Sequence, residues 1–119
     1  MLETISKALE SLGLPVWYGA AKTLKVEDVW DYIVFYRRNL SPSTNKTGFS
    51  DTYQVTIVCE EYVPDETVSG VIKAVLSIPG FKLAGTGGTY QYTVKPNTDQ
   101  VIELLSLDFV KPSKVCAHV

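Results

Sequence analysis

The feature that most constrains the fold is a pair of segments with the two-residue alternation of β-strands. A long polar segment joins them. In residues 29–36 both alternating sets are largely apolar, which is typical of a strand with neighbours on either side. In residues 52–59 one set is apolar and predicts a half-buried strand, with Tyr53, Val55, Ile57 and Cys59 facing inward. Loops between paired strands usually contain about two to five residues. We therefore expect an unusually long strand-connecting loop at about 38–50, where the residues are mostly polar.

A period of three to four residues predicts two helices. The first spans about three turns from Leu2 and stops before Gly13 and Pro15. Its apolar face is formed by Leu2, Ile5, Leu9 and Leu12. The second begins near Pro64, where the next two residues are acidic and favour a helix start, and it ends before Pro79. Its apolar stripe comprises Val68, Val71, Ile72, Val75 and Leu76.

Three further strand segments complete the pattern. Residues 15–19 form a short strand, residues 80–96 indicate a strand, a glycine-rich turn and a second strand, and residues 100–112 form the last strand. A loose tail is expected at about 112–119. Apart from the 38–50 loop, strand neighbours are joined by short turns. The prediction is one α+β domain over residues 1–119, with a mainly antiparallel sheet and two helices packed on one face.

Composition argues against several classes of protein. The chain has 119 residues, 45% of them apolar, and a formal net charge of −2, so electrostatics do not indicate a nucleic-acid binder. The N-terminus lacks a basic segment followed by an apolar block, and no apolar run approaches membrane-span length. We expect no signal peptide, no membrane contact and synthesis in a cytoplasm. Cys59 and Cys116 make no disulfide framework; a reduced pair is expected, and a bridge between them stays open.

Residues suited to catalysis are few and scattered. His118, the one histidine, is second from the end of the sequence, where side chains are usually exposed. Glu60 and Glu61 are strand neighbours that point to opposite faces, which opposes a shared proton or metal ion. The stretch "GTGGT" (residues 85–89) resembles a phosphate loop but precedes a strand rather than a helix, and it lacks a lysine. We expect no enzyme activity, catalytic residue, metal site or cofactor.

The 38–50 loop and the residue before it hold the most suggestive pattern. Arg37, Arg38, Lys46 and Phe49 combine positive charge with an aromatic ring, and no acidic residue occurs before Asp51. Three interpretations stay open: contact with a partner protein, contact with nucleic acid, and a solvated loop without a partner. Long loops kept in compact domains are often functional, which favours the partner contact. These four residues are therefore the expected assembly interface.

The order of the segments is similar to that of a known family. "LETISKALESLGLPVWYG" leads to "VWDYIVFYRRN", a long loop and "DTYQVTIVCEE". A helix that starts "VPDETVSGVIKAV" and the closing strands "TYQYTVKP" and "QVIELLSLDFV" follow. Over nearly the whole chain this layout resembles the small tail-terminator, or tail-completion, proteins of long-tailed (siphovirus-type) bacteriophages. The resemblance rests on length, element order and the long loop between two strands.

The resemblance implies a virion structural protein. Proteins of this family form a homohexamer ring at the head-proximal end of the finished tail tube, assembled in the host cytoplasm. The ring ends tail growth and provides the surface for head–tail joining. The implied partners are other copies of the chain, the tail tube protein and a head–tail connector or neck protein, and DNA passes through the ring without sequence-specific binding. The 38–50 loop becomes the contact element. Trp17, Tyr18 and Tyr90 are candidate interface anchors that fit a core position equally well.

A second interpretation comes from a different class of protein. It is a small cytoplasmic ligand-binding or enzyme domain, with a pocket between the helices and the sheet. A concentration-dependent higher oligomer favours the ring, whereas a strict monomer with a deep polar pocket favours the ligand-binding domain.

Overall fold

The computed structural model describes residues 2–20, 29–42 and 49–113. The elements follow one another as α1 (Leu2–Glu10), β1 (Val16–Tyr18), β2 (Tyr32–Pro42), β3 (Phe49–Glu60), α2 (Asp65–Leu76), β4 (Lys82–Val94) and β5 (Val101–Ser113). The strands form a five-stranded sheet in the order β1-β2-β3-β5-β4. β1 runs parallel to β2, and the other neighbours are antiparallel. The prediction of an α+β fold with a mostly antiparallel sheet is therefore confirmed.

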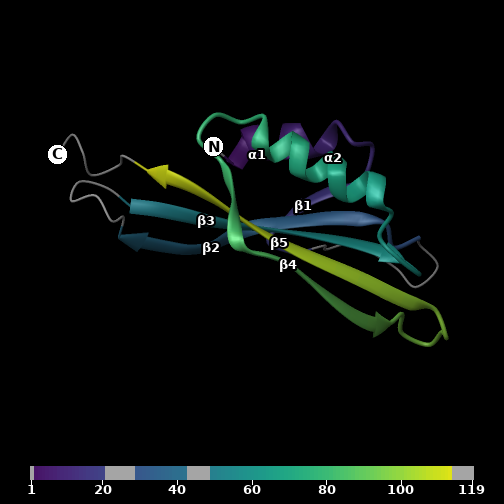
Figure 1. Ribbon diagram of the computed structural model, residues 1–119. Helices are drawn as coiled ribbons and strands as arrows, with labels where there is room; N and C mark the ends of the chain where they lie inside the picture. Colours follow the sequence, from purple (N-terminus) through teal and green to yellow (C-terminus); the bar gives the residue numbers. More distant parts are fainter. Residues whose placement is uncertain (1, 21–28, 43–48, 114–119) are drawn as a thin grey trace.

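Both helices lie on the same side of the sheet (Figure 1). Ile5 and Leu9 of α1 and Val71 and Val75 of α2 are buried in one apolar core. The residues that the sheet contributes to this core are Ile33, Phe35, Tyr53, Val55, Ile57, Cys59, Leu105, Leu107 and Phe109. The 12 residues of α2 span only roughly 18 Å, whereas the molecule is 52 Å long. The helices therefore cover only part of the sheet, and strands extend past them.

Both helices were predicted close to their observed positions. α1 ends just before Gly13, whose φ of +86° suits glycine, and α2 begins at Asp65, directly after Pro64. One member of the predicted apolar stripe was placed wrongly. Leu76, the last residue of α2, is exposed, although Val75 before it is buried.

Both ends of the predicted loop at about 38–50 are strand. β2 continues to Pro42 and β3 begins at Phe49, and these two residues are paired. The prediction failed because this part of the hairpin is polar, so it lacks the apolar alternation that reveals a strand. Residues 43–48 lie outside the described part of the chain. The C-terminal tail was expected to begin at about residue 112, but β5 pairs with β3 as far as Ser113.

The glycine-rich stretch does not reverse the chain. Leu83 pairs with Phe109 and Gly88 pairs with Leu107, so β4 passes the glycines and stays beside β5. The intervening residues form an irregular bulge in one strand, in place of the predicted turn between two strands. A Cβ on Gly88 would lie 2.8 Å from Leu107 Cδ2 and 3.0 Å from Leu105 Cδ1. Glycine therefore allows β4 to return close to β5 after the bulge.

Candidate assembly surface

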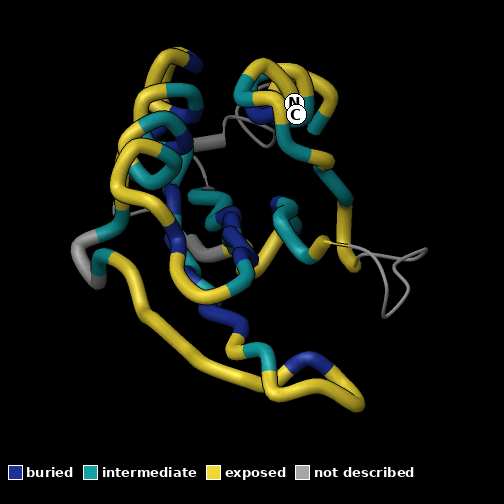
Figure 2. Tube along the Cα trace, turned by 90° about the vertical axis from the view of Figure 1, so that its right-hand side faces the viewer, coloured by how far each residue is buried: buried dark blue, intermediate teal, exposed yellow. Residues whose placement is uncertain are grey.

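The second half of β4 is exposed on both faces of the sheet. Residues 89–94 are all exposed, and β4 is the outermost strand. Tyr90, Tyr92 and Val94 keep 51%, 63% and 52% of their surface accessible. Figure 2 shows this run as a continuous exposed stretch far from the helix layer. A strand whose side chains belong to the core is usually covered on at least one face. This segment is covered on neither face, so it contributes little to the core.

The exposed Tyr92 lies opposite a largely buried carboxylate. Glu103, on the neighbouring strand β5, is paired with Tyr92 and is 9% exposed. Its Oε1 accepts a hydrogen bond from the Val63 N–H at 2.8 Å. The pKa of Tyr92 is raised, first because its hydroxyl hydrogen-bonds to Glu103. Tyr92 thus presents an aromatic ring to solvent, and tyrosine is enriched among the residues that anchor protein interfaces.

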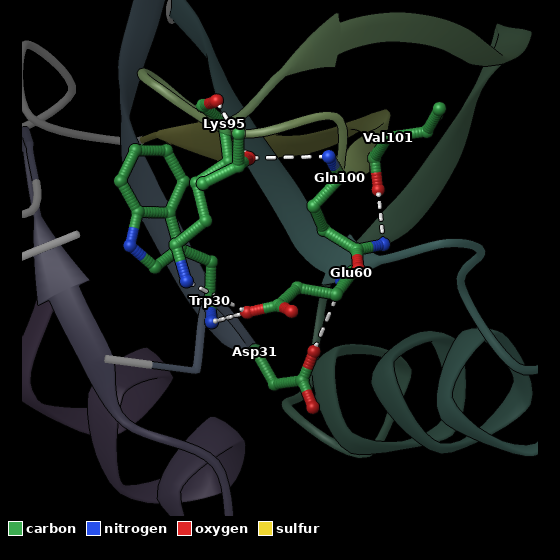
Figure 3. A network of polar contacts seen from close by, with 7 residues as sticks. Trp30, Asp31, Glu60, Lys95, Gln100 and Val101 are labelled. Carbon is green, nitrogen blue, oxygen red and sulfur yellow. Dashed lines mark hydrogen bonds and ion pairs between the residues drawn. The ribbon is translucent and has the colours of Figure 1, made fainter. Parts of the chain in front are cut away.

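A polar network joins the end of β4 to β3 and to the segment before β2 (Figure 3). Glu60 Oε2 accepts hydrogen bonds from the Trp30 N–H at 2.7 Å and from Lys95 Nζ at 3.2 Å. The Glu60 N–H in turn donates to Asp31 Oδ1 at 3.1 Å. These contacts lower the pKa of Glu60, with the Trp30 N–H contributing most and Lys95 next. Lys95 is 7% exposed, and its ammonium lies 5.5 Å from the centroid of the Trp30 ring.

A second polar network crosses the sheet face opposite the helices. Arg38 Nη1 lies 3.1 Å from Asp108 Oδ2, and Gln54 Nε2 donates to Asp108 Oδ1 at 3.2 Å. The Tyr36 hydroxyl donates to Gln54 Oε1. The register of β2 and β3 skips Arg38, which makes Arg38 the extra residue of a β-bulge. Arg38, Gln54 and Asp108, with Thr89 and Gln91 of β4, border a shallow groove of about 400 Å³.

The two ends of the sheet carry opposite charge. At the end where β2 meets β3, the described strands carry Arg37, Arg38, Lys82 and Lys111 against Asp51 and Asp108. At the opposite end, the strands and adjoining turns carry Asp31, Glu60, Glu61, Asp99 and Glu103 against Lys95. The described part of the sheet is thus electrically asymmetric along its length, although the net charge of the chain is only −2.

The structure places only part of the predicted assembly interface. Arg37 and Arg38 are exposed on β2, and Arg38 is paired with Asp108. Lys46 lies outside the described residues, as does the side chain of Phe49, whose backbone begins β3. No contact among these four predicted residues is described.

The three candidate aromatic anchors differ in exposure. Tyr90 is 51% exposed, and Tyr18 is 48% exposed with its ring 5.3 Å from that of Phe35, centroid to centroid. Trp17 is half-buried. The sequence analysis missed Tyr92 and Lys95. The stretch "TYQYTV" signals a strand, but it does not reveal that helices leave this strand uncovered.

The structure places some of the residues that were considered for catalysis. His118 lies outside the described residues. Glu60 is committed to Trp30 and Lys95, and "GTGGT" lies within β4 rather than before a helix. In the described ranges, no group of three or more His, Cys, Asp or Glu residues is arranged to hold a metal ion. Cys59 is a buried thiol, and buried apolar side chains fill much of the helix–sheet interface. A hollow of about 260 Å³ lies beside it and is lined by Leu14, Asp31, Cys59, Glu60, Tyr62, Pro64 and Thr67.

Comparison with known proteins gives no family assignment. No protein-family model matches the chain, and no curated protein matches it. Across residues 2–20, 29–42 and 49–113, no helix is both long and apolar enough to cross a membrane.

Proposed function

We propose that this chain is a bacteriophage tail-terminator protein, which caps the completed tail tube as a ring. The ring ends tail growth and offers the surface to which the head joins. The proposal is supported by one observation above others, the segment of β4 that is exposed on both faces and carries Tyr90, Tyr92 and Val94. Such a segment adds little to the stability of an isolated subunit, and exposed aromatic residues are enriched in protein interfaces.

The proposed partners follow from the ring. Other copies of the chain, six in all, form the ring itself, and the tail tube protein lies on one side of it. A head–tail connector or neck protein lies on the other side, and DNA passes through the centre without sequence-specific binding. The ring is assembled in the host cytoplasm and remains in the virion. Arg37 and Arg38 are exposed and suit contact with one of these partners. Lys46 and Phe49 stay in the proposed interface as predictions.

A binding experiment on purified components tests this function. Tail tubes assembled from the tube protein of the same phage are mixed with the gold-labelled chain and imaged by electron microscopy. We expect label at one end of each tube, because a cap recognises the growing end. We also expect capped tubes to stop lengthening when more tube protein is added. Label along the tube wall, or continued growth of labelled tubes, contradicts the proposal. A chain with the paired change Arg37→Glu and Arg38→Glu should label fewer ends, whereas the matched control Lys73→Glu on α2 should label as many ends as the unaltered chain.

A further inference from the structure

The hollow of about 260 Å³ beside Cys59, called the Cys59 hollow below, lies where three parts of the chain meet. Leu14 comes from the segment after α1, Cys59 from the end of β3, and Thr67 from the first turn of α2. Pockets for drug-sized ligands usually measure roughly 300 Å³ or more. The Cys59 hollow therefore suits a single side chain or a small molecule of similar size.

Two carboxylates line the Cys59 hollow, and each uses only one of its oxygens within the chain. Asp31 Oδ1 accepts the Glu60 N–H at 3.1 Å. Glu60 Oε2 accepts the Trp30 N–H at 2.7 Å and Lys95 Nζ at 3.2 Å. Asp31 Oδ2 and Glu60 Oε1 have no hydrogen-bond partner among the residues that the structure describes. Both oxygens can accept further hydrogen bonds, and Lys95 offsets only one of the two negative charges.

A buried thiol lines the same hollow without a hydrogen-bond partner. Cys59 is 5% exposed, and its sulfur contacts no donor or acceptor among the described residues. Burial raises the pKa of this thiol to about 11, and the negative charges of Asp31 and Glu103 add to the effect. The thiol is therefore neutral at neutral pH, and its sulfur can accept a weak hydrogen bond. The Thr67 hydroxyl is another acceptor on the wall of the hollow.

The rest of the wall is apolar and marks the opening. Leu14, Tyr62 and Pro64 line the hollow together with the acceptors. Tyr62 and Pro64 are exposed, whereas Cys59 is buried, so the hollow opens beside Tyr62 and closes at Cys59. Apolar walls around a few polar groups suit a ligand with a hydrocarbon stem and one charged head group.

The acceptors favour one kind of cation over others. A guanidinium is a planar fork that pairs best with both oxygens of one carboxylate, and here each carboxylate has already given one oxygen to the chain. An ammonium carries three donors on a compact head and can reach acceptors on separate residues. Within residues 2–20, 29–42 and 49–113, no three His, Cys, Asp or Glu residues are arranged for a metal ion. The N–H groups at the start of α2 oppose a cation, but Asp65 and Glu66 in its first turn offset them.

From these observations we infer that the Cys59 hollow binds a primary ammonium group carried on an apolar stem. The ammonium donates to the unpaired oxygens of Asp31 and Glu60, and the stem lies against Leu14 and Tyr62. The group is supplied by the lysine side chain of a partner protein or by a small free amine, and the chemistry that is recognised is the same. The inference goes beyond the proposed function and does not rest on it, because one chain supplies every lining residue.

Isothermal titration calorimetry of the full chain with n-butylamine tests the inference. n-Butanol lacks the charge and n-butylguanidine has the fork-shaped head, so each should bind at least about tenfold more weakly. Asp31→Asn keeps the oxygen that accepts the Glu60 N–H but loses the charge, and it should weaken n-butylamine binding roughly tenfold. The matched control Asp99→Asn removes a charge from the same end of the sheet but outside the hollow. It should change the affinity by less than about twofold, because salt screens distant charges.

A blocked tripeptide with a central lysine identifies the source of the ammonium. Tighter binding than n-butylamine indicates a lysine of a partner protein, and weaker binding indicates a small free amine. The inference is overturned if n-butylamine does not bind, if n-butanol or n-butylguanidine binds as tightly, or if Asp31→Asn and Asp99→Asn weaken binding equally. Circular dichroism checks that each variant is folded. If Asp31→Asn unfolds, Thr67→Val removes one acceptor with little change of shape, and an unchanged affinity in that variant overturns the inference.

Discussion

Lys95 Nζ lies 3.2 Å from Glu60 Oε2, and this contact joins two strands that are not neighbours in the sheet. Glu60 is the last residue of β3, Lys95 directly follows β4, and β5 lies between them. The Trp30 N–H donates to the same carboxylate oxygen, and the Trp30 ring lies beside the Lys95 ammonium. The three residues therefore tie the end of β4 to the end of β3 and to the segment before β2.

Replacing Lys95 should lower stability and loosen the hairpin. Lys95→Met keeps most of the apolar stem but removes the ammonium that pairs with Glu60, so a carboxylate loses a charged partner. We expect the midpoint of thermal unfolding to fall by several degrees. The matched control is Lys82→Met, which replaces an exposed lysine at the start of β4 and should unfold close to the unaltered chain. Equal midpoints for the two variants contradict the role given to Lys95.

The fluorescence of Trp30 should report the titration of Glu60. The pKa of Glu60 lies below its ordinary 4.5, because the Trp30 N–H and Lys95 stabilise the carboxylate. A lowered folded-state pKa contributes stability above pH 4.5 that is lost as pH falls through the folded value. In a Trp17→Phe background, which leaves Trp30 as the sole tryptophan, emission should change with a midpoint below pH 4.5. Glu60→Gln should abolish this step, and a midpoint above 4.5 argues against the contact.

Cys59 should make the fold sensitive to alkaline pH. Burial raises the pKa of its thiol from 9.0 to about 11, and Asp31 and Glu103 add to the effect. A raised folded-state pKa contributes stability that is complete below pH 9.0 and is lost as pH rises toward about 11. The expected loss is of order 2 kcal/mol. Urea unfolding at a series of pH values should show a smaller decline for Cys59→Ala than for the unaltered chain. Parallel declines exclude Cys59 as the source.

A charge on the buried side of α2 should unfold the domain. Val71 is fully buried between α2 and the sheet, so Val71→Asp places an unpaired carboxylate in the core. The expected loss is about 3 to 5 kcal/mol, enough to unfold a protein of ordinary stability. Ser69→Asp introduces the same carboxylate on the exposed side of α2 and should change stability little. Circular dichroism during urea unfolding measures both, and similar midpoints contradict the assigned burial.

The elements that face the core could be predicted from the sequence, because burial produces periodicity. Tyr53, Val55, Ile57 and Cys59 were predicted to face inward, and all four are buried. The two helices could be predicted for the same reason, since their buried residues are apolar and recur at helical spacing. These residues are Ile5, Leu9, Val71 and Val75. These positions owe their character to contact with apolar neighbours, which selects residue type at a fixed spacing.

The strand segments outside the core could not be predicted in the same way. Arg38 and Leu40 are exposed strand residues, so the end of β2 resembled a loop. Gly87, with a φ of +67°, and Gly88 suggested a reversal of the chain, whereas they form a bulge within β4. The exposure of Tyr92 depends on where the helix layer ends, and that is a property of the assembled fold.

The length of phage tails tests the central claim most directly. Phage particles made without this chain should be compared with particles made with it, by measuring tail lengths in negative-stain electron micrographs. If the chain caps the tube, its absence should give tails that exceed the normal length and lack heads. Supplying the unaltered chain should restore one uniform length and head attachment. Tails of normal length joined to heads in the absence of the chain contradict the claim that it ends tail growth.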